Sequence, residues 1–459
     1  MGGLIKLYQR WIASPAKRIR ASQLIALMFL LIIAVGTALL MLPAASSGGE
    51  GAGFVTALFT ATSATCVTGL SLVDTYIGWT AFGQAVILCM IQLGGLGFMS
   101  AASLVVFALR RKVGLKQRLV MAQALSISDM EGVVRLQKLV LAGSFGIEAI
   151  GALILTLRFW PEYGLRKALH WGVFHSISAF CNAGFDIFGE LAPGSSLQLF
   201  YSDPIVLLTI SALIIVGGLG FFVWEEVARL RSFRKCSVYT KLVLLSTGVL
   251  LAAGTAAVAL IEWNNPSTLG TMGVGDKLLN SFFQSVTSRT AGFASISQGG
   301  LTEAGKAVTM VLMLIGGSSG STAGGIKTVT LMVLMLFLWS RIRGKGTVSV
   351  FKRTIPSGQV MDAMTICGIL LSLALFGGVV ISATCGISFT DSLYEAVSAL
   401  ATVGLTADAT GKLNLFTQIL IIIYMYFGRV GVLTISLGFL MGDKAQERYR
   451  YAQTNLLIG

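Results

Sequence analysis

The sequence has few charged residues and almost no histidine. Only 12% of its 459 residues are Asp, Glu, Lys or Arg, and there are two histidines. A soluble chain of this length would hold about two or three domains with charged surfaces, which this composition excludes. Apolar residues make up 55% of the chain, the mean hydropathy is +0.81, and runs such as 24–42 approach or reach the length of a bilayer span. We therefore expect a polytopic membrane protein.

Cysteine is also sparse, and it follows no pattern. There are six cysteines without C-x-x-C spacing: Cys66, Cys89, Cys181, Cys236, Cys367 and Cys385. Most fall inside apolar segments, so we interpret them as small apolar residues rather than disulfides or metal ligands. The apolar segments offer no convincing H-E-x-x-H motif, paired-aspartate site or Ser/Lys site. The sequence therefore predicts no enzymatic activity and no covalently bound cofactor.

The charge that is present is mostly positive and is confined to a few segments. The formal net charge is +14, and Lys and Arg cluster at residues 6–20, 110–138, 229–241, 341–353 and 444–450. Because cytoplasmic loops of membrane proteins are rich in these residues, we expect the clusters and both termini to lie inside the cell. We interpret them as contacts to anionic membrane lipid, not to nucleic acid. The first apolar run is of spanning length without a convincing cleavage pattern, and we interpret it as a retained signal anchor.

A short motif ending in glycine occurs four times along the chain. The copies start with Ser or Thr and end in Gly followed by Leu or Phe, at residues 63–70, 178–185, 287–293 and 398–405. Their glycines are 115, 108 and 112 residues apart: Gly69, Gly184, Gly292 and Gly404. A second glycine-rich motif follows each copy, with first glycines Gly94, Gly217, Gly316 and Gly428. This spacing indicates a fourfold internal repeat.

Each repeat is expected to hold a spanning helix, a short re-entrant helix, the glycine turn and a second spanning helix. The chain then divides into an N-terminal segment (1–20), four repeats (21–110, 135–232, 233–343 and 344–442), a linker (111–134) and a C-terminal tail (443–459). The second spanning helices are expected near 78–109, 203–230, 305–340 and 414–440. Non-helical backbone at membrane depth must line a cavity or be buried. The fold class is thus an all-α polytopic membrane protein, with four pseudo-repeats of helix, pore helix, filter loop and helix around a central pore.

The four turns suit a monovalent cation. Carbonyls from four non-helical segments around one axis can replace the hydration shell of an ion, and the preceding short helices would direct their negative ends toward it. The turns carry few acids, which argues against calcium and magnesium. A single copy would be read as an ordinary Gly/Ser/Thr loop, but four regular copies favour a pore. The candidate filter residues are Thr65, Cys66, Val67, Thr68, Gly69, Cys181, Asn182, Ala183, Gly184, Thr290, Ala291, Gly292, Ala401, Thr402, Val403 and Gly404.

These turns resemble the degenerate filter segments of the Trk/Ktr/HKT potassium transporters, in which one chain repeats the helix–pore loop–helix unit of potassium channels four times. The resemblance covers nearly the whole chain and is strongest toward the membrane subunit of bacterial Ktr systems. It maps one filter glycine to each turn, whereas potassium channels have two glycines per turn. The resemblance implies uptake of K⁺, stimulated by sodium in several Ktr systems, with Na⁺ as a co-ion or an activator.

The resemblance also implies partners and a location. It implies a homodimer in the bacterial cytoplasmic (inner) membrane and a cytoplasmic ring of RCK-type subunits that binds ATP or ADP and docks on the basic inner loops. We expect this nucleotide control to be supplied in trans, because no segment of the sequence reads as a domain of that kind. The alternative is a Trk-type symporter coupled to protons or sodium, whose turns bind two different ions.

Residues 316–325 interrupt an apolar segment of the third repeat. Half of them are glycine, and each glycine inside a helix costs about 1 kcal/mol relative to alanine. A broken helix beneath the turns is expected, although close packing through small residues would also explain the composition. The resemblance favours an intramembrane gating loop, made of Gly316, Gly317, Ser318, Ser319, Gly320, Ser321, Thr322, Ala323, Gly324 and Gly325. A Walker A loop is rejected, because Ile326 separates Gly325 from Lys327 and no strand precedes it.

Arg429 occupies the position of Gly95, Gly218 and Gly317 in the alignment of the repeats. A charge inside the membrane is costly and marks a functional site by default. Arg429 would repel cations or contact the gating loop below the turns. Alternatively, it would be a structural residue capped by carbonyls of the broken third helix. The resemblance favours the pore-facing role.

Four other polar residues are weaker candidates. His170 and His175 precede the second turn, and we expect them to pack rather than to act as ligands. Arg289 lies in the third turn and is expected to anchor it. Glu148 lies in a spanning segment, and no partner for it is evident from the sequence.

Overall fold

The computed structural model describes residues 21–97 and 133–431. In these ranges the regular structure is helical, apart from one antiparallel hairpin of β1 (Ser349–Val350) and β2 (Arg353–Thr354). The predicted all-helical architecture is therefore confirmed. The predicted N-terminal segment 1–20, nearly all of the linker 111–134 and the tail 443–459 lie outside the described residues.

The described helices form four successive groups that follow the repeated motifs. The first group is α2 (Ala21–Leu40), α3 (Phe54–Cys66), α4 (Thr75–Gly78) and α5 (Ala81–Leu96), and the second is α8 (Val133–Phe180), α9 (Pro204–Leu219) and α10 (Phe221–Leu230). The third is α11 (Val238–Glu262), α12 (Val274–Thr287), α13 (Glu303–Leu314) and α14 (Thr328–Ile342), and the fourth is α15 (Ser357–Cys385), α16 (Phe389–Leu400) and α17 (Leu415–Val430). Single 3₁₀ turns lie in the connections: η1 (Phe188–Glu190), η2 (Gln198–Phe200), η3 (Phe233–Lys235) and η4 (Thr410–Lys412).

Side-chain caps fix where the helix after each turn begins. The Asp203 carboxylate accepts two backbone N–H groups of α9 at 3.0 and 3.1 Å, and Pro204 occupies the first turn, where no N–H is needed. Thr80, Thr302 and Asn414 each accept one backbone N–H at the start of α5, α13 and α17. In each of the four repeats, the helix after the turn therefore begins with a side-chain N-cap.

α8 combines the first spanning segment and the short helix of the second repeat. Pro161 lies inside it, and Gly164 has φ 76° and ψ 157°, which is not helical. Proline removes a backbone donor, and glycine tolerates the left-handed φ, so the chain bends at this point. The part after the bend leads into the second turn.

In three of the expected second spanning segments, an equivalent glycine follows the described helix. α9 and α10 meet at 94° around Gly220, whose φ is 90°, so the continuous helix expected over 203–230 is wrong. α5 and α17 end at Leu96 and Val430, and the glycine that follows each, Gly97 or Gly431, has a φ of 80° or 90°. Such φ values cannot continue a right-handed helix. The rest of the helices expected up to 109 and 440 lies outside the described residues. The break expected at 316–325 is present, because α13 and α14 are separate helices.

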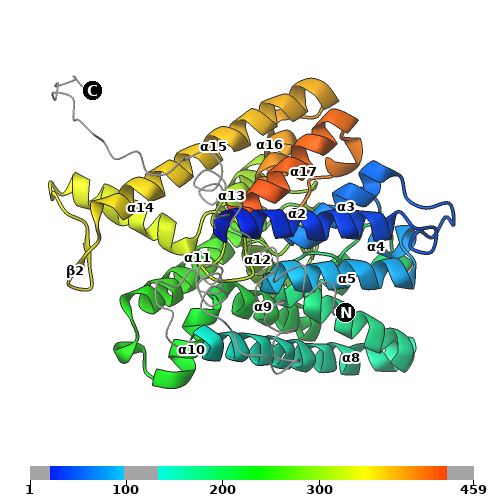
Figure 1. Cartoon of the computed structure of the whole chain (residues 1–459), viewed down its shortest axis with the longest axis horizontal. Helices are drawn as coiled ribbons and strands as arrows, with labels where there is room; N and C mark the ends of the chain where they lie inside the picture. The colour runs from blue at the N-terminus through cyan, green and yellow to red at the C-terminus, as the bar shows by residue number, and fades with distance from the viewer. Residues whose placement is uncertain (1–20, 98–132, 432–459) are drawn as a thin grey trace, which may run out of the picture.

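The outer surface of the helices is apolar. Within the described residues, four helices are long and apolar enough to cross a membrane, or five if α9 and α10 count as one bent span. Large apolar side chains face outward, among them Leu260 at 82% and Met361 at 69% exposure, as expected next to lipid. In Figure 1, α4 lies at one end of the molecule, and the hairpin of β1 and β2 lies at the opposite end. The basic segment 341–353 is therefore far from the loops around α4.

Candidate functional site

The four turn glycines meet in a closed ring. Each glycine lies against the residue before the next turn glycine, in the pairs Gly69–Ala183, Gly184–Ala291, Gly292–Val403 and Gly404–Thr68. A Cβ added to any of the four glycines would lie 2.7 Å or less from the carbonyl oxygen of its partner. Only glycine permits this approach. The structure thus brings the end of each predicted filter segment, residues 65–69, 181–184, 290–292 and 401–404, to one axis.

The backbone of the turns is strained in the same way in every repeat. The residue two positions before each turn glycine has a positive φ although it carries a side chain: 57° at Val67, 60° at Asn182, 65° at Thr290 and 52° at Thr402. The turn glycines themselves have φ between 69° and 97°. A left-handed residue with a side chain costs roughly 1–2 kcal/mol. Its recurrence at one position of all four turns, in four different sequence contexts, indicates a functional constraint on the turn.

A hydroxyl group at the end of each short helix braces its turn. In the first and fourth turns, the hydroxyls of Ser63 and Ser398 accept the N–H of the turn glycine at 3.0 and 3.1 Å. In the second and third turns, the hydroxyls of Ser178 and Thr287 donate to the carbonyl of the phenylalanine after the glycine, at 2.7 Å in both. The residue before each glycine also donates its N–H to the carbonyl of these same four residues. The braces therefore hold both sides of every turn.

Several threonine hydroxyls of the turns have no partner in the described part of the chain. Thr65, Thr68, Thr290 and Thr402 each have a buried hydroxyl oxygen without a hydrogen bond to the described residues. Buried hydroxyls are ordinarily paired, so these four are free to bind water or a cation. The predicted filter residues therefore include polar oxygens as well as carbonyls.

Glycines of the second motif let the following helix touch the turn. A Cβ on Gly94, Gly217 or Gly428 would collide with a backbone carbonyl at the end of the short helix of the same repeat. In the third repeat, the equivalent Gly316 instead meets the backbone of Gly324. In the third repeat, a folded-back segment of chain therefore takes the place that the helix after the turn has in the other three repeats.

This glycine-rich segment, 316–325, lies against the second and fourth turns. The Thr322 hydroxyl lies 3.3 Å from the carbonyl oxygen of Phe180 and 3.2 Å from Oδ1 of Asn182. A Cβ on Gly324 would lie 3.0 Å from the carbonyl oxygen of Ala401. The base of the segment is closed by a backbone hydrogen bond of 2.9 Å from Gly316 to Ile326. The segment is thus an ordered loop packed on the turns rather than a helix.

The Arg429 guanidinium joins this segment to the end of α5. Its Nη1 donates to the Thr322 carbonyl, and its Nη2 donates to the carbonyls of Gly94 at 2.5 Å and Gly95 at 3.1 Å. The last carbonyls of a helix lack partners within the helix and carry its negative partial charge. Arg429 therefore bridges the fourth, first and third repeats through backbone oxygens. The two roles expected for Arg429 are therefore found together: it caps backbone carbonyls, and it contacts segment 316–325.

The weaker candidates take mostly structural places. Arg289 is buried, and its Nη2 donates to the Gly316 carbonyl at 3.5 Å. The Lys327 Nζ donates to the carbonyl of Ala323 at 2.6 Å, next to the start of α14. His175 Nδ1 lies 2.7 Å from the carbonyl of Trp171 and is the donor, since a carbonyl only accepts. Its ring is also stacked on that of Phe188.

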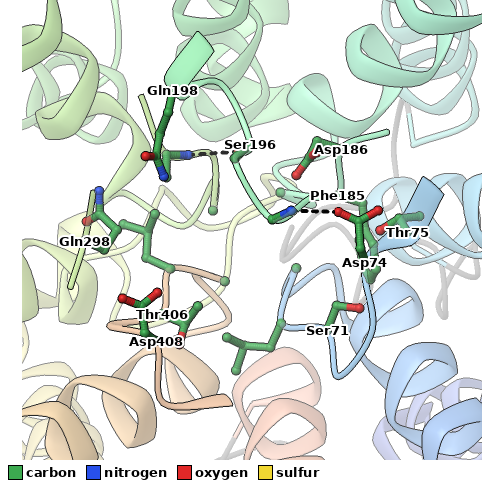
Figure 2. Close-up of a pocket in the computed structure, with 18 of the residues that line it drawn as sticks. Ser71, Asp74, Thr75, Phe185, Asp186, Ser196, Gln198, Gln298, Thr406 and Asp408 are labelled. Atoms are coloured by element: carbon green, nitrogen blue, oxygen red, sulfur yellow. Dashed lines mark hydrogen bonds between the residues drawn. The ribbon is translucent and has the colours of Figure 1, made fainter. Parts of the chain in front are cut away.

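Loops of all four repeats line a partly open cavity of about 240 Å³, on the side of the glycine ring away from segment 316–325, and the four turn glycines line it too. Figure 2 shows Asp74, Asp186 and Asp408 around it. Asp74 accepts the N–H of Gly194 at 2.9 Å and so joins the first and second repeats. Burial, and to a smaller extent the Asp74 carboxylate, raise the pKa of Asp186 to about 7. Carboxylates in a narrow cavity concentrate cations.

The sequence interpretation missed the braces and the carboxylates of the cavity. A signal for the braces was present, since Ser63, Ser178 and Ser398 all stand six residues before their glycine. The third brace, Thr287, stands five residues before Gly292, because the third turn is one residue shorter. The cavity carboxylates lie at different distances after their glycines, and no repeated position marks them.

Comparison with known proteins identifies the family of this arrangement. The chain matches a family model described as TrkH, a cation transport protein, over residues 9–448. The chain belongs to the TrkH family of cation transport proteins. The resemblance noted from the four turns is thereby confirmed, and the protein is a transporter rather than an enzyme.

Several relatives of this TrkH-family chain are similar along almost their whole length. It is 39% identical over 448 residues to the potassium/sodium uptake protein NtpJ of Enterococcus hirae, covering 96% of this chain and 98% of that protein. It is 40% identical over 432 residues to the Ktr system potassium uptake protein B of Bacillus subtilis, covering 94% and 96%. Its fold matches the crystal structure of the potassium transporter TrkH from Vibrio parahaemolyticus with a TM-score of 0.73, over 93% of this chain and 86% of that chain at 15% identity.

Proposed function

We propose that this TrkH-family protein takes up potassium ions along the axis enclosed by its four turns. The observation that carries the proposal is the closed ring, in which each turn glycine contacts the carbonyl before the next one. A ring of carbonyls can replace the water of a weakly hydrated monovalent cation. The relatives from Enterococcus hirae and Bacillus subtilis are named as potassium/sodium and potassium uptake proteins, which supports the choice of ion.

The electrostatics around the ring favour a cation. The helices α3, α12 and α16 end directly at the first, third and fourth turns, and the last part of α8 ends at the second turn. The C-terminal end of a helix carries a partial negative charge, so four such ends stabilise a cation without a formal anion. The cavity with Asp74, Asp186 and Asp408 would then supply cations to the ring from outside.

Segment 316–325 is the gating loop in this proposal. It closes the path beneath the ring through its contacts to Asn182 and Ala401, and Arg429 holds it in place. Opening requires these hydrogen bonds to break or to rearrange. Deletion of 317–324 should therefore raise flux, and Thr322→Val, which removes the bond to Asn182 while keeping the shape of the side chain, should raise it less. Unchanged rubidium flux in both variants would contradict the gating role.

The remaining parts of the proposal come from the family resemblance. The protein would be a homodimer in the bacterial cytoplasmic membrane, with both termini inside. A cytoplasmic RCK-type ring that binds ATP or ADP would dock on basic segments such as 229–241 and 341–353. Sodium would stimulate uptake, as a co-ion or as an activator. The positions of the two basic segments, away from α4, are compatible with this orientation.

The test is potassium-limited growth of a bacterial strain that lacks its own potassium uptake, followed by rubidium and sodium flux into liposomes that hold the purified protein. We expect restored growth and a rubidium flux larger than the sodium flux, with an increase when the regulatory ring and ATP are added. A folded protein that restores no growth and passes no rubidium, with or without the ring, would contradict the proposed function. Rubidium uptake driven against its own gradient by a proton or a sodium gradient would favour the symporter.

A further inference from the structure

The spanning part of α8 holds a buried carboxyl group that the transport path described above does not use. Glu148 is 4% exposed, and the Nε2 of Gln92, on α5, lies 3.0 and 3.1 Å from its two oxygens. The thiol of Cys181, the first predicted filter residue of the second turn, lies 3.9 Å from Glu148 Oε1 and 3.7 Å from Gln92 Oε1. The carboxyl group therefore stands directly behind the second turn.

The scaffold of the repeat does not require a carboxyl group at this place. In the second repeat the Ser176 hydroxyl donates to the carbonyl of Glu148 at 2.6 Å. The equivalent bond in the third repeat, from Ser285, goes to the carbonyl of Leu251 at 3.1 Å. Leu251 thus occupies the third-repeat position of Glu148 and packs there as an apolar side chain. A buried carboxyl group is costly in a membrane, so its presence only behind the second of these two turns indicates a role of its own.

The surroundings of Glu148 couple it to the ring. A Cβ on Gly95 would lie 2.6 Å from the Cys181 sulfur, so the end of α5 that carries Gln92 is packed against the second turn. The same end of α5 receives the Arg429 hydrogen bonds at Gly94 and Gly95. A displacement of Gln92 is therefore transmitted both to Cys181 and to the contact that holds segment 316–325.

We propose that Glu148, oriented by Gln92, is a positioning residue for the second turn and a determinant of the choice between potassium and sodium. The inference rests on the proposed function of the four turns as a filter. The pair fixes the backbone at Cys181, next to the left-handed Asn182, and so fixes the spacing of the carbonyls in this quarter of the ring. Selectivity between ions of similar charge depends on the number and placement of such carbonyls.

The test compares four variants with a matched control. Glu148→Leu installs the residue of the third repeat, Gln92→Leu removes the partner, and the double variant Glu148→Leu/Gln92→Leu removes both. Glu148→Gln keeps a hydrogen-bond acceptor of the same shape. Leu251→Val alters the equivalent apolar position behind the third turn. Each purified protein is reconstituted in liposomes, and the ratio of rubidium to sodium flux is measured.

We expect Glu148→Leu and Gln92→Leu each to lower the rubidium-to-sodium ratio about tenfold, a usual size for coupling within one hydrogen-bonded network. The double variant should lower the rubidium-to-sodium ratio no further than either single change, because the two residues act as a unit. Glu148→Gln should retain most of the ratio, and Leu251→Val should leave it unchanged.

An unchanged ratio in Gln92→Leu and in every folded Glu148 variant would overturn the inference, as would an equal shift in Leu251→Val. If Glu148→Leu does not fold, Gln92→Leu decides, because it keeps the Glu148 carboxyl group at the site, and Glu148→Gln serves as the control that should retain the ratio. Absence of rubidium flux in the unmodified protein would refute the proposed function itself, and this inference with it. A changed ratio with intact rubidium flux in the unmodified protein supports both.

Discussion

The first and fourth turns differ from the second and third in how the same hydroxyl group is used. In the first and fourth, Ser63 and Ser398 accept the N–H of the glycine on the axis. In the second and third, Ser178 and Thr287 donate to a carbonyl beyond the glycine. The local sequences follow the same division, with Gly-Leu in one pair and Gly-Phe in the other. A hydroxyl can donate or accept, so one residue type serves both arrangements.

The division shows that the ring has two halves rather than fourfold symmetry. Contacts between the glycines run from the first turn to the second, third and fourth and back to the first. The two turns of each kind are therefore neighbours, not opposite one another. In the proposed function, a cation on the axis would meet one half in which serine hydroxyls bind the glycine N–H groups, and one half in which the hydroxyls bind the carbonyls after the glycines. Substitutions in the two halves should have unequal effects.

The largest effect is expected where the ring admits no side chain at all. Gly404→Ala places a Cβ against the Thr68 carbonyl at a φ of 94°. Strain of about 3 kcal/mol corresponds to a loss of flux of at least about 100-fold. The matched control is Gly411→Ala, in the same repeat, where a Cβ would meet no atom within 4 Å. Rubidium flux measures both, and equal flux in the two variants would show that the ring does not carry the ions.

The next largest effect should come from the residue that joins the two halves beneath the ring. Arg429→Ala removes the bonds to Thr322, Gly94 and Gly95. We expect rubidium flux to rise about tenfold, since charged hydrogen bonds each contribute about 1.5–3 kcal/mol. Arg429→Lys should give a smaller rise, because an ammonium group cannot reach both partners with a planar fork. If both variants elute normally as purified proteins and rubidium flux is unaltered in both, Arg429 does not hold the gating loop closed.

Removing the brace hydroxyls tests the difference between the halves directly. Ser63→Ala or Ser398→Ala leaves a buried N–H on the axis without its partner, at a cost of about 1–3 kcal/mol. Ser178→Ala and Thr287→Val free a carbonyl instead, which has a second lone pair and belongs to the residue after the ring glycine. For Ser63→Ala and Ser398→Ala we expect a roughly three- to tenfold loss of rubidium-to-sodium selectivity, which is the size that the cost of an unpaired N–H predicts. For Ser178→Ala and Thr287→Val we expect a smaller loss. Equal losses of selectivity in all four variants would show that the two halves of the ring do not differ in function.

The smallest effect concerns the cavity outside the ring. Asp186 follows the second turn, and burial with the nearby Asp74 holds its pKa at about 7, so it is negative above pH 7 and neutral below. Asp74 and, across the cavity, Asp408 are the other carboxyl groups that line it (Figure 2). Lowering the external pH from 8 to 6 should weaken the apparent rubidium affinity about twofold, through loss of one charge in a narrow cavity. Asp186→Asn should flatten this dependence, whereas Glu190→Gln, outside the lining, should preserve it.

The sequence alone could predict the turns because glycine is demanded there by the backbone. Gly69 and its three counterparts recur at regular spacing, and no other residue fits the approach of two backbones at a positive φ. The broken third helix was predictable for a related reason, since the density of glycine in 316–325 opposes a helix. Arg429 was noticed because it replaces a glycine in the alignment of the repeats.

Contacts between distant segments were not predictable in this way. Gln92 and Glu148 lie 56 residues apart, and neither the period of a helix nor a motif indicates that they meet. The bend at Gly220 was missed because a Gly-Leu-Gly sequence in an apolar run is equally compatible with close helix packing. Only the φ of 90° distinguishes the two.

The most direct measurement is the location of rubidium in the protein by anomalous diffraction from crystals grown in rubidium. A peak on the axis of the ring is predicted, within coordinating distance of the carbonyl oxygens of Thr68, Ala183, Ala291 and Val403, and it should vanish in Gly404→Ala. Rubidium bound elsewhere in the membrane region, with no density at these four carbonyls, would contradict the central claim that the four turns form one cation path.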